Sequence, residues 1–238
     1  HGKPYTMKNS VPTLLSFNGG YVDTMGFLTL QNLFTAHVTG NFVMIGDALA
    51  NGSSGIYAKL LALPVFCITI LISRSIMLRL APSDHRALRA MLLVKVALFA
   101  VAAAFAIWHG PFDVPDSPGL ILTGMVLVAA MAIQNGIHRV HLKDAPPTTL
   151  MTGTTTQIML DLAQLLYPQS SEDPAVVRAR MHRFLIAVVV FAAGCALAAL
   201  GYVALGLWSY VIPPLVALAV LIMHQTLPRP PGLDQTAH

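Results

Sequence analysis

The sequence predicts an all-α, multi-pass membrane protein of about six spans and two short re-entrant helices, built as two inverted repeats. Three observations support this prediction. Of the 238 residues, 55% are hydrophobic and only 10% are charged, whereas about 25% are charged in soluble domains. Apolar stretches of about 20 residues, enough for a helix to cross a bilayer, recur along the chain. Two shorter segments, 36–47 and 149–161, each pass through Thr-Gly into an apolar run that holds a carboxylate.

The composition and motifs also exclude several function classes. The formal net charge of +4 would suit nucleic acid, but the basic residues flank apolar stretches, which is typical of membrane proteins. We therefore expect no nucleic-acid partner. The chain contains no nucleotide-binding, nucleophile-elbow or zinc-protease signature and no tight His/Cys/carboxylate spacing for a metal. We expect no enzyme activity, no cofactor and no metal site.

The first repeat is expected to occupy residues 11–110. Its first span, 11–34, carries Asp23 near its middle, where an ionisable group is costly and by default indicates function. Gly19, Asp23 and Gly26 share one face of this helix, which predicts close approach of a neighbouring helix. The segment 37–50 is too short for a crossing, which needs about 17 residues, so a re-entrant helix is expected there. Two further spans follow, at 56–80 and 90–108.

The second repeat is expected to occupy residues 118–227. Its spans are predicted at 120–137, 184–204 and 210–227, and a second short Thr-Gly helix at 152–166. The proline-rich tail, 228–238, is expected to be disordered.

The basic loops predict the topology, because short cytoplasmic loops carry an excess of Lys and Arg. If both Thr-Gly segments are re-entrant, the basic clusters at 79–95, 139–143 and 178–183 all lie in the cytoplasm, together with both termini. If both segments crossed fully, the 178–183 cluster would move outside. Three crossings per repeat is an odd number, so the halves should have opposite orientations. Inverted repeats with discontinuous helices near the midplane are a recurring plan of transporters.

The two Thr-Gly segments are the candidate functional site. Thr before Gly is typical of a helix start at which Thr caps the helix, and the free N–H groups of a re-entrant helix suit an anionic or strongly polar ligand. We expect the two helix starts to meet near the bilayer centre around a shared cavity. The candidate substrate- or ion-binding residues are Asp23, His37, Thr39, Gly40, Asn41, Gln134, Asn135, Thr152, Gly153, Thr154, Gln157 and Asp161.

Two groups of these residues carry more specific predictions. A polar stripe at three- and four-residue spacing is expected to line a water-filled cavity; it consists of Thr154, Gln157, Asp161 and Gln164. Asp23 and His37 are candidate proton carriers. No basic residue shares the depth of Asp23 in its helix, so an unpaired carboxylate that binds a proton is expected. For His37, a hydrogen-bonded loop histidine is an equally good interpretation.

These motifs resemble a known family. The resemblance is carried by Gly20-Tyr21-Val22-Asp23 with Gly26-Phe27, by Thr39-Gly40-Asn41, and by Gln134-Asn135 followed by Thr152-Gly153. They resemble the YoaK-like family of bacterial inner-membrane proteins, long catalogued as a domain of unknown function. The resemblance covers nearly the whole chain, and the second motif is a looser copy because Thr154 replaces Asn. It implies a multi-pass protein of the bacterial inner membrane that transports small molecules, without implying a substrate or catalytic residues.

The leading hypothesis is a secondary transporter or facilitator of a small polar or anionic solute, with Asp23 as the site of proton coupling. A passive channel would share the repeats but would need no titrating carboxylate. A non-catalytic subunit of a membrane complex would instead bind its partners through the face rich in Ala and Gly at 184–204. The lipid bilayer and the solute are the expected partners, and both a homo-oligomer and a larger membrane complex stay open as assemblies.

Overall fold

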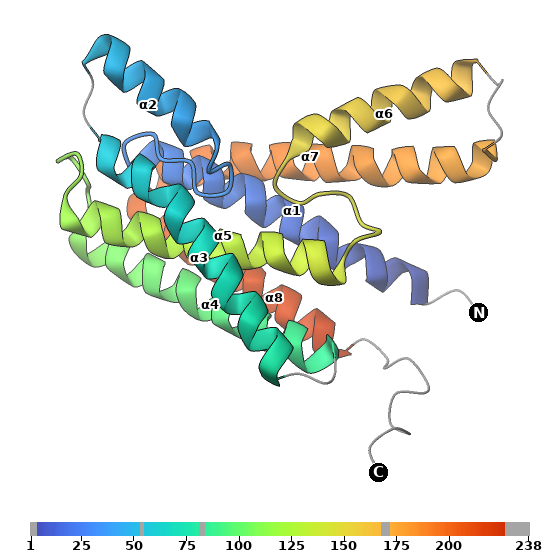
Figure 1. The fold of residues 1–238 in the computed structure, drawn as a ribbon, viewed down its shortest axis with the longest axis horizontal. Coiled ribbons are helices and arrows are strands. Elements are labelled where there is room, and N and C mark those ends of the chain that lie inside the picture. The colour runs from blue at the N-terminus through green and yellow to red at the C-terminus, as the bar shows by residue number, and fades with distance from the viewer. Residues whose placement is uncertain (1–3, 53–54, 81–83, 168–171, 227–238) are drawn as a thin grey trace.

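The computed structural model describes residues 4–52, 55–80, 84–167 and 172–226, and all regular structure in these ranges is helical (Figure 1). The elements are α1 (Pro4–Thr29), α2 (Gly40–Asn51), α3 (Ile56–Leu80), α4 (Asp84–His109), α5 (Pro118–His141), α6 (Met151–Leu166), α7 (Pro174–Leu205), the 3-10 helix η1 (Gly206–Val211) and α8 (Ile212–Thr226). The predicted all-α class is confirmed. The tail predicted to be disordered, 228–238, lies outside the described residues.

The observed helix ends differ from the predicted spans where polar residues decide them. α3 has the predicted bounds, 56–80. α7 begins ten residues before the predicted 184, where the Asp173 side chain accepts a hydrogen bond from the N–H of Ala175 at 2.8 Å and caps the helix. α1 instead ends at Thr29, before the predicted 34, and Gln31 and Asn32 follow with φ of 53° and 62°. Such left-handed residues stop an α-helix.

Four stretches of the described chain are long and apolar enough to cross a membrane. They are Ile56–Arg79, Arg86–His109, Pro118–His141 and Pro174–Gln225, the last of which contains α7, η1 and α8. These stretches support the predicted multi-pass membrane protein. α1 is not among them, since polar residues such as Asn18 and Asp23 interrupt its apolar character. Six full crossings and the re-entrant course of α2 and α6 stay predictions.

The helices pack in a pattern that recurs between the first half, α1–α4, and the second half, α5–α8. α1 packs on α7, as α5 packs on α3. α4 lies against α5, as α8 lies against α1, and α2 contacts α3, as α6 contacts α7. α4 and α8 are the equivalent helices of the two halves, and they contact each other directly. The two halves therefore interlock through equivalent pairs of helices and do not form separate bundles.

The closest crossing joins α1 and α7. A Cβ atom at Gly20 would overlap the carbonyl oxygen of Phe191, and a Cβ atom at Gly194 would overlap that of Phe17. Glycine on both helices lets the two backbones approach to contact, as in small-residue interfaces of membrane helices.

The glycine face predicted for α1 is also crowded, mainly by loops, and α5 reaches it through Gln134, whose Nε2 would lie 3.4 Å from a Cβ atom at Gly19. The carbonyl oxygen of Thr148 lies over Gly19, and the side chain of Thr35 lies over Gly26. A helix therefore approaches this face at Gly19, through the Gln134 side chain of α5, whereas Thr35 of the loop after α1 covers Gly26. The chain segments that follow α5 and α1 come back to it, because each is fastened there by polar side chains.

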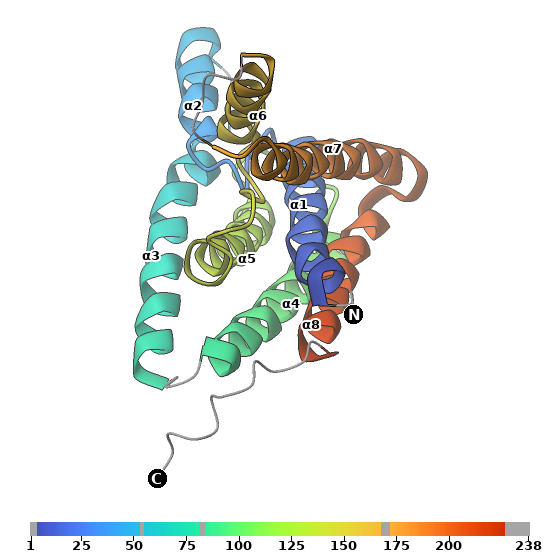
Figure 2. The same ribbon diagram turned by 90° about the vertical axis from the view of Figure 1, so that its right-hand side faces the viewer.

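The two short helices, α2 and α6, begin toward the middle of the molecule and diverge. In Figure 1 they run from there toward opposite ends. Figure 2, turned by 90°, shows both at the same edge of the molecule. Each begins where a loop that carries one of the motifs ends. The first motif loop is 30–39, before α2, and the second motif loop is 142–150, before α6.

Candidate functional site

The first motif loop is fastened to α1 by Asp23. Its Oδ1 accepts hydrogen bonds from the backbone N–H groups of Thr35 at 2.8 Å and Ala36 at 2.7 Å, and its Oδ2 lies 2.6 Å from His37 Nδ1. The Asp23 side chain is 7% exposed and that of His37 is 30% exposed. The expectation of an unpaired carboxylate is wrong, because the chain after α1 folds back and supplies the partners that the helix itself lacks.

Asn41 closes the same loop. Its side chain accepts a hydrogen bond from the N–H of Phe34 at 2.9 Å and donates one to the carbonyl of Phe34 at 2.8 Å, and it is fully buried. Thr39 precedes α2 but makes no capping hydrogen bond with its side chain, so the prediction that it caps the helix is wrong. A Cβ atom at Gly40 would lie 3.1 Å from the Phe34 ring. In this motif Asn41 holds the loop, and Gly40 makes room for the aromatic ring.

The second motif loop is fastened to α5 in a corresponding way. Thr149 donates a hydrogen bond from its hydroxyl to Asn135 Oδ1 at 2.8 Å, and Gln134 Nε2 donates to the Thr148 hydroxyl at 3.1 Å. In both pairs the partners are 14 residues apart, as are Asp23 and His37. The structure thus places the predicted residues Gln134 and Asn135 at the second motif. Thr148 and Thr149, which complete it, were not predicted, because their role depends on where the loop returns.

Each loop returns along the helix that precedes it. Asp23 lies six residues before the end of α1 at Thr29, and Asn135 lies six residues before the end of α5 at His141. At about 1.5 Å per helical residue, each loop comes back by roughly 9 Å. α2 and α6 start from these returned positions (Figure 1).

The start of α6 differs from the prediction. Its N-cap is Leu150 and not Thr152, and no side chain caps the helix. Thr152 and Gly153 are exposed, and a Cβ atom at Gly153 would meet nothing within 4 Å. Thr154 is buried and donates its hydroxyl to the carbonyl of Leu150 at 3.3 Å. The glycine of the second motif therefore permits no close approach here, unlike Gly40.

The polar stripe of α6 faces α7. Asp161 is fully buried and receives hydrogen bonds from Arg180 of α7, from Nε at 3.0 Å and from Nη2 at 2.7 Å. Gln157 also donates to Asp161, at 2.8 Å. Arg180 reaches Glu172 at 2.7 Å as well, and this hydrogen bond lowers the pKa of the Glu172 carboxyl below its usual value. The expectation that this stripe lines a water-filled cavity is wrong, because Arg180 of the neighbouring helix α7 pairs with its carboxylate, Asp161.

Replacing Arg180 by Gln is expected to loosen α6. Removing one partner of a buried ion pair typically costs about 3 kcal/mol or more, since the other charge stays buried. Because α6 packs chiefly on α7, this cost should appear as local opening of α6 and not as global unfolding. Hydrogen exchange should become faster in residues 151–166 and stay unchanged in 118–141. The exposed Arg178, changed to Gln, is the matched control; equal protection of α6 in the Arg180 variant and the wild type would contradict this role.

Lys95 places a buried amino group next to the second motif loop. Its Nζ donates a hydrogen bond to Gln134 Oε1 at 2.6 Å and lies 5.3 Å from the centroid of the Phe99 ring, and the residue is 0% exposed. Within the described residues no carboxylate forms an ion pair with it. Lys95 was expected in the cytoplasmic basic cluster at 79–95, and this expectation is wrong because the residue is buried beside Gln134. Its position within the otherwise apolar run 90–108 was the signal in the sequence that could have indicated its burial.

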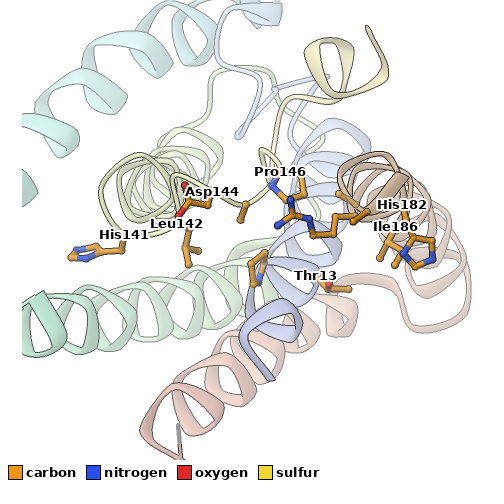
Figure 3. A pocket seen from close by; sticks show the side chains of 12 residues that line it. Thr13, His141, Leu142, Asp144, Pro146, His182 and Ile186 are labelled. Atoms are coloured by element: carbon orange, nitrogen blue, oxygen red, sulfur yellow. The ribbon is translucent and has the colours of Figure 1, made fainter. Parts of the chain in front are cut away.

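A cavity of about 480 Å³ opens beside the second loop. It is lined by residues from the first half of α1, the connection between α5 and α6, and the first half of α7. Thr13, Asp144 and Pro146 are among them (Figure 3), and Arg183 lines it as well. The Nε atom of Arg183 is buried and has no hydrogen-bond partner among the described residues. Because Pro146 lies two residues before Thr148, the cavity adjoins the second motif loop.

The apolar spans and the two fastened loops define the class of this protein: a multi-pass helical membrane protein with a polar, loop-built interior. The chain belongs to the DUF1275 family, described as proteins of unknown function, whose family model matches residues 11–223. It is similar to the UPF0700 transmembrane protein YoaK of Bacillus subtilis (strain 168), with 25% identity over 209 residues, covering 81% of this chain and 83% of that protein. The predicted resemblance is confirmed. No solved structure matches the chain.

Proposed function

We propose that this protein is a secondary transporter or facilitator of a small polar, anionic solute in the bacterial inner membrane. The observation that carries this proposal is the matched attachment of the two motif loops, in which Asp23 and Asn135 each hold the residue 14 positions later. Irregular backbone at membrane depth is tolerated only where it is buried in protein or lines a water-filled cavity. Two such loops, each starting a short helix, match the discontinuous helices at transporter binding sites.

The proposed architecture is two inverted repeats, 11–110 and 118–227, with α2 and α6 as re-entrant helices and both termini in the cytoplasm. The recurring packing pattern of the two halves and the equal return of the two loops support this arrangement. It also keeps every basic cluster on the cytoplasmic side.

The topology can be tested by cysteine labelling. In a background with Cys67 and Cys195 replaced by Ala, Asn51→Cys at the end of α2 and Tyr167→Cys after α6 are each introduced alone. Both positions are exposed. A membrane-impermeant maleimide is expected to label Asn51→Cys from outside intact cells and Tyr167→Cys only after the membrane is opened. Labelling of both from the same side would contradict the inverted arrangement.

The preference for an anion follows from the hydrogen-bond donors at the second loop. Lys95 places a buried amino group beside Gln134, which links it to Thr148, and no carboxylate among the described residues pairs with it. Helix starts also favour negative charge. A solute coming from the cytoplasm would reach this loop through the cavity beside it, which both the Arg183 guanidinium and the Asp144 carboxylate line. The preference for an anion therefore rests on the donors nearest the loop, the Lys95 amino group and the Nε atom of Arg183.

Proton coupling is assigned to Asp23 and His37. The carboxylate is buried and accepts hydrogen bonds from three backbone N–H groups, those of Thr35, Ala36 and His37, while the imidazole is partly exposed to water. His37 can carry a proton between water and Asp23, to which its Nδ1 is hydrogen-bonded at 2.6 Å. Because Ala36 and His37 lead into α2, a change in this pair acts directly on the start of a short helix.

The experiment that tests the function uses purified protein in liposomes that contain a pH-sensitive dye. Small organic anions, first selected by a thermal-shift screen, are added outside under an imposed pH gradient. Proton-coupled accumulation of one anion is expected. Flux without proton movement would favour a passive channel instead. No flux, together with copurification of stoichiometric partner proteins, would favour a subunit of a membrane complex.

A further inference from the structure

A second cavity of about 480 Å³ lies between α3 and α5 and shares no lining residue with the cavity described above. One stripe of α3, from Phe66 to Met77, and one stripe of α5, from Ile133 to Val140, form its walls. The α3 residues recur at three- and four-residue spacing, as do Ile133, Ile137 and Val140 of α5, so each set lies on one helix face. Met91 of α4 also lines the cavity. At Gly136 a Cβ atom would lie 3.6 Å from Ile70 Cδ1, an ordinary contact distance. The two faces thus enclose a groove between two membrane spans.

The chemistry of this groove is simple. Its walls are mostly apolar, and its charged lining residues are Arg74 of α3 and Arg139 of α5. Arg74 lies six residues before the end of α3 and Arg139 two residues before the end of α5. Both guanidinium groups belong to exposed residues, and no carboxylate lines the cavity with them. The groove therefore combines an apolar slot with two cations and no counter-charge from its own lining.

We propose that this groove binds an anionic phospholipid, with the phosphate between Arg74 and Arg139 and an acyl chain along the apolar walls. Guanidinium groups bind phosphate oxygens through paired hydrogen bonds, and basic pockets between membrane helices on the cytoplasmic side take anionic lipid headgroups. The outward side of α3 is apolar and exposed, with Leu71 at 68% and Ile72 at 52%. α3 is a candidate span, so lipid surrounds the groove, and a water-soluble anion would leave its apolar walls unfilled.

The groove also touches the second motif loop. Asn135 and Leu150 line it, and Asn135 is the residue that accepts the hydrogen bond from Thr149. A bound lipid would pack against the start of α6 and stabilise the fastened loop. The lipid site does not depend on solute transport, so it can be tested by binding and stability alone.

The test reconstitutes the full-length protein in nanodiscs of phosphatidylcholine with and without phosphatidylglycerol. Phosphatidylglycerol is expected to raise the thermal unfolding temperature of the wild type and to remain bound in native mass spectrometry. The double variant Arg74→Gln/Arg139→Gln should lose both effects. At about a fivefold loss of affinity for each basic residue near the headgroups, binding should fall by about 25-fold. The matched control, Arg79→Gln/Arg89→Gln, removes two exposed arginines outside the groove and should bind as the wild type does.

A second variant tests the apolar slot without changing its charge. Ser73→Leu places a larger side chain in the groove and should reduce retention of phosphatidylglycerol while both arginines remain. The proposal would be overturned if phosphatidylglycerol stabilised the double variant as much as the wild type. It would also be overturned if phosphatidylcholine were retained equally, or if inorganic phosphate gave the same rise in unfolding temperature, since the site would then not recognise an anionic lipid.

Discussion

Asp23→Asn is expected to yield a folded protein that no longer accumulates its solute against a gradient. The amide keeps an oxygen that can accept the N–H groups of Thr35 and Ala36, so the first motif loop stays attached to α1. The amide cannot titrate, however, so the residue that faces His37 Nδ1 can no longer take up and release a proton. Uptake driven by a pH gradient in proteoliposomes should be abolished, while exchange of solute down its own gradient should survive.

Asp23→Ala separates the structural role of this residue from its charge. The alanine removes every acceptor, and each buried donor left without a partner costs about 1–3 kcal/mol. Its unfolding temperature should therefore fall well below that of the Asp23→Asn variant. Full pH-driven accumulation by Asp23→Asn would exclude Asp23 as the coupling residue and favour a channel or a complex subunit. An Asp23→Ala variant as stable as the wild type would show that the loop is held by other contacts.

Gly194→Leu is expected to have the largest effect on folding of any single change considered. A side chain at this position would overlap the carbonyl of Phe17, which is backbone and cannot rotate away, so α1 and α7 would have to separate. Forcing extra atoms into a packed interface costs about 1–3 kcal/mol, and more when the backbone must move. We expect a loss of more than about 3 kcal/mol, seen as a lower unfolding temperature and poor recovery from detergent.

Gly46→Leu is the matched control for this prediction. Gly46 is also within a helix, α2, but a Cβ atom there would meet nothing within 4 Å. The control should fold like the wild type, so that the cost at Gly194 can be assigned to the helix crossing and not to glycine replacement. Equal stability of the Gly194 and Gly46 variants would contradict the close approach of α1 and α7.

The membrane class and most helices could be predicted from the sequence because they depend on local properties. Whether a helix can cross the bilayer depends on the length of its apolar run, which is visible in the sequence. For example, α3 has the predicted bounds. The two Thr-Gly segments were recognisable as short helices because each is too short to span and is bounded by polar residues. The family resemblance also rested on short motifs, and the match over residues 11–223 confirms it.

The partners of the buried polar groups could not be predicted, because they are set by contacts between distant segments. Asp161 was expected to face water, but Arg180, 19 residues later, lies beside it only because α6 and α7 pack together. Lys95 was expected at the membrane surface, yet the fold buries it against Gln134. In both cases the residue type indicated a polar environment, and only the neighbouring helix determined which one.

The sequence by itself determined that this protein is a helical membrane protein with two polar interruptions, because hydropathy and segment length are properties of the chain alone. Only the tertiary structure decided that the interruptions are loops fastened by Asp23 and Asn135, and that Thr39 and Thr152 cap nothing with their side chains. The physical reason is that a buried hydrogen-bonding group must find a partner, and which partner it finds depends on how far each loop folds back along its helix.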